Sequence, residues 1–163
     1  MKLVVDASVA VKWLVPEEGT KDAERVLASD ASLHVPDLVF AEAASALRKR
    51  VNRKQLTEAE ADMVLRALNA MPLNVHGTRG LAPAALAVSC AIPVTPYDAI
   101  YLALAEALDC HMVTADRRLL KALAPAPPKV ANKIMGYHPM RRRVIESSGT
   151  GLAVRARWMG DLP

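Results

Sequence analysis

The chain has 163 residues, of which 52% are apolar, so it is long enough for one domain with a sizeable core. No apolar run approaches the roughly 20 residues that span a bilayer, and the apolar start is too short for a signal peptide. We therefore expect a soluble cytoplasmic protein with no membrane partner. Cys90 and Cys110 have neither a metal-type nor a disulfide-framework spacing, so both are expected to be buried.

The net charge of +4 belongs to the end of the chain. Residues 1–130 hold 15 Lys and Arg against 15 Asp and Glu, whereas residues 131–163 hold six basic residues against two acids. A basic balance often indicates a nucleic-acid partner, but here it describes only the tail. Residues 136–163, which include Arg141, Arg142 and Arg143, lack periodicity. They are predicted to be a basic, poorly ordered extension, with a flexible RNA-contacting arm as the alternative.

Short apolar segments alternate with helical patterns over residues 1–135. Strands are expected at residues 3–5, 33–35, 73–75 and 112–114, with an edge strand within 130–135. Helices are expected over about eight residues after Asp6 and at 18–28, 37–54, 57–71, 78–90, 95–108 and 117–123. Asp37 should cap the 37–54 helix, and Ala23, Val26 and Leu27 should face inward. This alternation predicts an α/β domain over residues 1–135: a three-layer sandwich with a mainly parallel sheet of four to five strands flanked by helices.

Four acids stand at positions where acids are unexpected. Asp6 and Asp116 follow apolar strands, where ligands bind in open α/β sheets. Glu42 lies on a mostly apolar helix face, and Asp98 lies in the first turn of its helix, after Thr95 and Pro96. Each acid also has a structural explanation. Asp6, Asp98 and Asp116 could be helix caps, and Glu42 could be a partly exposed helix residue.

Taken together, the four acids predict a metal site. Carboxylates crowded into one cleft repel each other unless a cation joins them, and Mg²⁺ and Mn²⁺ prefer oxygen ligands. Such an ion lowers the pKa of a bound water and neutralises charge on a phosphoryl group, which predicts phosphodiester hydrolysis.

Four ordered motifs then resemble the PIN-domain nucleases, and among them the VapC-type toxins of VapBC toxin–antitoxin pairs. The matching stretches are residues 4–8, 36–50, 95–105 and 113–120. The resemblance implies a PIN-like domain over residues 1–135 and a Mg²⁺- or Mn²⁺-dependent endoribonuclease that cuts RNA such as tRNA or rRNA. It also implies a homodimer held inactive by a cognate VapB-type antitoxin.

By the same resemblance, Asp6, Glu42, Asp98 and Asp116 are the catalytic, metal-binding acids. Ser8 and Thr114 match supporting hydroxyl positions, and Ser45 replaces an Asn that many relatives carry three residues after the helix glutamate. The predicted RNA contacts are Arg48, Arg50, Arg117 and Arg118, of which the first two could instead only suit the helix dipole.

Two other functions are compatible with the pattern. Asp6 at a strand end could be the nucleophile of an aspartate-based phosphatase, although Ser8 stands where that chemistry normally has a second acid. The chain could also be a catalytically inert PIN-like binding module. The presence of all four acids argues against this last alternative.

Overall fold

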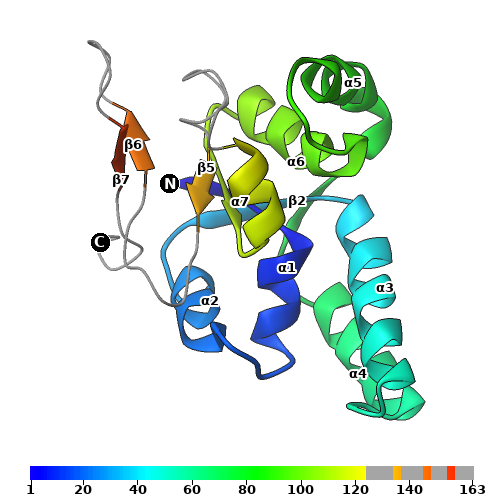
Figure 1. The fold of residues 1–163 in the computed structure, drawn as a ribbon. Helices are drawn as coiled ribbons and strands as arrows, with labels where there is room; N and C mark the ends of the chain where they lie inside the picture. Colours follow the sequence, from blue (N-terminus) through cyan, green and yellow to red (C-terminus); the bar gives the residue numbers. More distant parts are fainter. Residues whose placement is uncertain (124–133, 137–144, 148–153, 157–163) are drawn as a thin grey trace.

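A five-stranded parallel sheet forms the centre of the domain (Figure 1). The computed structural model describes residues 1–123, 134–136, 145–147 and 154–156. The strands follow the order β3-β2-β1-β4-β5, and all neighbours are parallel. Their bounds are β1 Lys2–Val5, β2 Ser32–Pro36, β3 Asn74–His76, β4 His111–Thr114 and β5 Ile134–Gly136. The predicted α/β class with a parallel sheet is therefore confirmed.

Helices connect these strands, as the crossovers of a parallel sheet require. The first predicted helix is split, because α1 spans Ala7–Ala10 and continues as the short 3-10 segment η1, Val11–Trp13. A second 3-10 segment, η2, spans Thr78–Gly80 and precedes α5. The other helices are α2 Thr20–Leu27, α3 Leu38–Asn52, α4 Glu58–Asn69, α5 Ala82–Ala91, α6 Pro96–Ala107 and α7 Arg117–Leu123.

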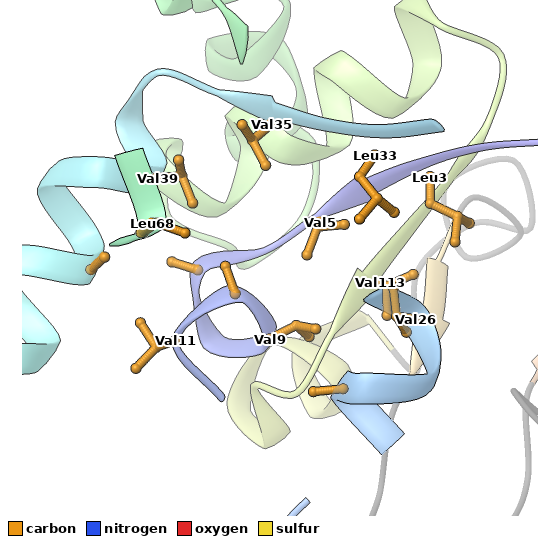
Figure 2. Close-up of a cluster of buried hydrophobic side chains, with 14 of the residues drawn as sticks. Leu3, Val5, Val9, Val11, Val26, Leu33, Val35, Val39, Leu68 and Val113 are labelled. Carbon is orange, nitrogen blue, oxygen red and sulfur yellow. The ribbon is translucent and has the colours of Figure 1, made fainter. Parts of the chain in front are cut away.

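The sheet has an apolar core on each face. Side chains alternate along a strand, so Leu3 and Val5 of β1 point into one core while Val4 points into the other. The first core also contains residues of α1 to α4 and is shown in Figure 2, where Val5 and its cluster members Val9, Val39 and Leu68 are labelled. The second core packs Val4 against α6 and α7. This places α6, which carries Asp98, against the sheet.

Three local predictions were wrong. Leu27 is 38% exposed, because α2 buries only Ala23 and Val26. Cys90 is exposed, whereas Cys110 is buried as expected, because α5 buries only Ala85 against its neighbours. Asp37 does not cap α3 with its side chain: its Oδ1 accepts a hydrogen bond of 3.1 Å from the Thr78 backbone instead.

The end of the chain is described only in part. Gly136 belongs to β5, while β6 (Ile145–Ser147) and β7 (Val154–Ala156) pair as a two-stranded antiparallel sheet. The other residues of the predicted 136–163 extension, including the three consecutive arginines, lie outside the described residues.

No single helix in the described part of the chain is long and apolar enough to cross a membrane. Taken together, the consecutive helices α5 and α6 are long and apolar enough by length and composition, but they meet at a bend of 113°.

Candidate active site

The register of the sheet brings Asp6 and Thr114 together. Val5 of β1 lies opposite Val113 of β4, and the Asp6 backbone N–H donates to the Val113 carbonyl at 3.0 Å. The next residue of each strand is therefore carried to the same carboxyl edge of the sheet. Thr114 is fully buried and Asp6 is 9% exposed, so both side chains are largely removed from solvent.

Two hydroxyl groups hold the Asp6 carboxylate. Ser8 Oγ and Thr114 Oγ1 donate to Asp6 Oδ2 at 2.5 and 2.6 Å. Each hydroxyl in turn accepts a backbone N–H, from Ala115 and Asp116 respectively, at 3.0 Å. Because a hydroxyl has one proton and these amides occupy its acceptor side, that proton is directed at Asp6. Ser8 and Thr114, which were predicted as supporting hydroxyl positions of the site, therefore both contact Asp6.

Glu42 enters the same region from α3. Tyr101 of α6, which is only 1% exposed, donates its hydroxyl to Glu42 Oε2 at 2.5 Å. Burial, followed by the charges of Asp6 and Glu42, raises the pKa of Tyr101 far above its ordinary value, so the phenol stays protonated and remains a donor. Tyr101 was not among the predicted site residues, although its place one turn after Asp98 could have indicated it.

Asp98 and Asp116 also act as helix caps, which was the alternative explanation for these acids in the sequence. Thr95 and Asp98 form a capping box at the start of α6, with Thr95 Oγ1 donating to Asp98 Oδ2 at 2.7 Å. Asp116 Oδ1 accepts the backbone N–H of Arg118 at 2.7 Å at the start of α7. Asp6, by contrast, makes no side-chain capping bond to α1, so the capping explanation was wrong for that residue.

A pocket of about 410 Å³ unites three of the four acids. Its lining includes Glu42 of α3, Asp98 in the first turn of α6 and Asp116 just before α7. The remaining lining residues are Pro93, Val94, Thr95, Tyr97, Arg118, Leu119 and Ala122. Asp6 does not line this pocket, but it lies close enough for its charge to raise the pKa of Glu42.

Neither the buried Asp6 nor the partly buried Glu42 forms an ion pair with a described residue. Burial raises the pKa of Asp6, the hydroxyls of Ser8 and Thr114 oppose that rise, and the charges of Asp98 and Asp116 add to it. The pKa of Glu42 is also raised, mainly by burial, with Tyr101 opposing the rise. Nearby carboxylates with raised pKa values form a site whose charged state a cation would stabilise.

The donor chemistry fits a hard divalent cation. Each of the four carboxylates accepts its hydrogen bonds on one oxygen, and within residues 1–123 its second oxygen accepts none. Among the described residues, no group of three or more His, Cys, Asp and Glu side chains is arranged to hold a metal ion. Mg²⁺, which usually keeps several waters and takes one or two protein carboxylates, suits this spacing better than a metal needing a complete protein cage.

The four arginines predicted to contact RNA have different surroundings. Arg118 lines the acid pocket, and no described carboxylate forms an ion pair with it. Arg117 lies 3.4 Å from Glu18, and Arg50 pairs with Glu17. Arg48 is exposed on α3. Only Arg118 therefore combines a free guanidinium with a place in the pocket, and the RNA-contacting role of all four stays a prediction.

Known proteins resemble this chain over the same region. The family described as PIN domain matches residues 3–124. Ribonuclease VapC3 of Pyrobaculum aerophilum is 40% identical over 121 residues, which cover 73% of this chain and 92% of that protein. Ribonuclease VapC9 of Mycobacterium tuberculosis is 37% identical over 72% of this chain and 87% of its own length. A toxin–antitoxin complex from Klebsiella pneumoniae shares the fold, with a TM-score of 0.59 and 16% identity, over 85% of this chain and 98% of that one.

Proposed function

This chain belongs to the PIN-domain family, and on that premise we propose that it is a VapC-type endoribonuclease, the toxin of a toxin–antitoxin pair. Its reaction is the hydrolysis of phosphodiester bonds in RNA, supported by a divalent cation, Mg²⁺ or Mn²⁺. The relatives' identity, 37–40% over most of their own length, supports the activity. The grouping of the four acids supports the requirement for a divalent metal ion.

One observation carries the proposal. Carboxylates from α3, α6 and α7 line a single pocket, Asp6 at the end of β1 lies beside them, and each keeps one oxygen free of hydrogen bonds from described residues. A buried acid such as Asp6 without a cationic partner destabilises a fold. The grouping of the four acids at the carboxyl edge of the sheet is therefore expected of a binding site rather than of a structural network.

One or two of the four acids would hold the cation directly and the others would face its waters. When bound, the ion would supply an activated water and neutralise charge on the phosphate. The other residues keep the ligands in place. Ser8 and Thr114 orient Asp6 so that its free Oδ1 stays available, and Tyr101 does the same for Glu42. The capping box fixes the backbone beneath Asp98, and the α7 amides fix Asp116. Arg118, which lines the pocket, is the arginine that we propose meets the phosphate.

The partners follow from the same proposal. We propose that a VapB-type antitoxin inhibits the chain, that the chain forms a homodimer, and that it acts in the cytoplasm on structured RNA such as tRNA or rRNA. Co-purification of the chain with the product of a neighbouring gene, together with loss of cleavage in the complex, would test the first of these.

Mapping RNA 5′ ends after induction of the chain tests the activity. The parent should create new 5′ ends at a small set of positions, and the purified protein should cut the same RNA with Mn²⁺ or Mg²⁺ but not with EDTA. Glu58→Gln, which removes an acid from the first turn of α4 outside the pocket, is the matched control and should cut like the parent. Cleavage that persists in EDTA would refute the metal dependence. A phospho-enzyme trapped at Asp6 would indicate a phosphatase.

A further inference from the structure

Tyr97 differs from every other aromatic residue in the described part of the chain. Tyr101 is buried, Phe40 packs against the first core, and the Trp13 indole N–H donates to the Ala23 carbonyl at 2.7 Å. Tyr97 is 62% exposed, and its hydroxyl makes no hydrogen bond with a described residue. A single exposed aromatic residue is ordinary on a surface, but this one lines the acid pocket.

The backbone under Tyr97 is held firmly. Tyr97 lies in the first turn of α6, between Pro96 and Asp98, inside the capping box that Thr95 and Asp98 form. Proline restricts the backbone at the first helical position, and the capping box adds two hydrogen bonds around it. The ring is therefore presented beside the acids from a fixed helix start rather than from a loop.

The pocket is lined by two chemically different kinds of side chain. Glu42, Asp98 and Asp116 supply carboxylate oxygens, and Arg118 supplies a positive charge. Tyr97, Pro93, Val94, Leu119 and Ala122 supply apolar surface. A phosphate suits the charged side chains, with their cation, and the flat apolar face of a base suits the apolar ones. The pocket volume of about 410 Å³ falls in the range of small-molecule sites, roughly 300–1,000 Å³.

We propose that the Tyr97 ring is the base-stacking platform of the substrate site and holds the nucleobase next to the scissile phosphate. This inference rests on the proposed ribonuclease function and deepens it, because it assigns the base-binding part of the pocket. Stacking on an aromatic ring accepts any base, so Tyr97 strengthens binding of unpaired nucleotides without selecting a sequence. The substrate at the point of cleavage is then an unstacked, single-stranded nucleotide.

Binding of two short RNAs tests the platform. One probe is a fluorescein-labelled adenosine 12-mer, and the other is the same chain with abasic sites in place of all bases. Both are measured by anisotropy with Ca²⁺ in place of Mg²⁺, because the acids repel phosphates when no cation neutralises them. The parent and Tyr97→Phe should bind the base-bearing probe about tenfold more tightly than the abasic one. Tyr97→Ala and Tyr97→Leu should bind both probes alike. Arg118→Gln should weaken binding of both probes by the same factor, because a contact to phosphate does not depend on the base.

Leu86→Ala is the matched control. Leu86 is 60% exposed on α5 and does not line the pocket, so its loss should leave the preference for bases unchanged. A base preference retained by Tyr97→Ala would overturn the inference. So would a change in oligomeric state of that variant on size-exclusion chromatography with light scattering, since the ring would then contact a second copy.

The two proposals fail in different ways. If the parent neither cleaves cellular RNA with Mn²⁺ nor binds either probe, the ribonuclease function fails and the platform with it. If the parent cleaves RNA and prefers the base-bearing probe, but Tyr97→Leu does so equally, only the platform fails.

Discussion

Glu17 has surroundings opposite to those of Asp6 and Glu42. Glu17, before α2, is flanked by Lys12 and Arg50. Burial alone would raise the pKa of Glu17, but the hydrogen bonds and charges of these two cations lower it. Asp6 is buried and Glu42 is partly buried, yet they have hydroxyl donors and further acids around them, and their pKa values are raised.

This difference distinguishes an acid that stabilises the fold from an acid that belongs to the candidate site. At Glu17 the fold supplies the opposite charge itself, so the carboxylate ties the loop before α2 to α3. At Asp6 and Glu42 the fold supplies orientation without neutralisation, and a bound cation would complete the charge balance. The following predictions test whether the two groups really differ in this way.

The largest expected effect is that of Asp6→Asn on RNA cleavage. The substitution keeps an oxygen that can accept from Ser8 and Thr114 but removes the charge, so kcat/KM should fall by at least about a hundredfold. The free energy of unfolding without metal should not fall, because a buried, uncompensated charge is lost. A variant that cleaves like the parent would show that Asp6 is not a ligand.

Metal binding should stabilise the folded protein, and it should do so through the acids of the candidate site. At a Mg²⁺ or Mn²⁺ concentration of 100 times Kd, the free energy of unfolding of the parent should increase by about 2.7 kcal/mol. Thermal unfolding with and without the ion measures this, and Asp6→Asn should lose most of the increase while Glu17→Gln should keep it. An equal increase in the parent and Asp6→Asn would place the metal elsewhere.

Tyr101→Phe should alter the pH dependence of cleavage. The phenol hydroxyl lowers the pKa of Glu42 by donating to its charged form, so its removal raises that pKa further. The acidic limb of kcat/KM should then move to higher pH, so that activity on that limb falls by about tenfold at a given pH, because a hydrogen bond to a charged group contributes about 1.5–3 kcal/mol. The ring itself remains, so far-UV circular dichroism and the oligomeric state should not change. An unmoved acidic limb would contradict a positioning role.

The smallest expected effect is at Glu17, and it concerns stability alone. Glu17→Gln should reduce the free energy of unfolding at pH 7 by about 1 kcal/mol or less, since its side chain is 30% exposed and solvent weakens the ion pairs. Its folded pKa is lowered, so the parent has this contribution above the unfolded value of 4.5 and loses it as pH falls through the folded pKa. Parent and variant should therefore converge in denaturant titrations at acid pH. A constant difference from pH 7 to pH 3 would refute the charge explanation, and cleavage should stay at the parent level throughout.

Much of this protein could be predicted from its sequence because the signals are local. The alternation of apolar segments with helical patterns is enough for a parallel α/β sheet, and Thr95, Pro96 and Asp98 specify a helix start within four residues. The acids at strand ends were visible for the same reason, since in a parallel sheet every strand ends at the same edge.

Other features depended on contacts between distant segments. The β1–β4 register sets Thr114 against Asp6, and the packing of α6 on the sheet brings Tyr101 to Glu42, 59 residues away in the chain. Leu27 and Cys90 were misjudged because burial depends on which face of a helix finds a partner, not on the residue type. The sequence determined which acids could act together. Only the tertiary structure decided that Glu17 would be neutralised by Lys12 and Arg50 while Asp6 and Glu42 would not, because charge compensation depends on what packs beside each carboxylate.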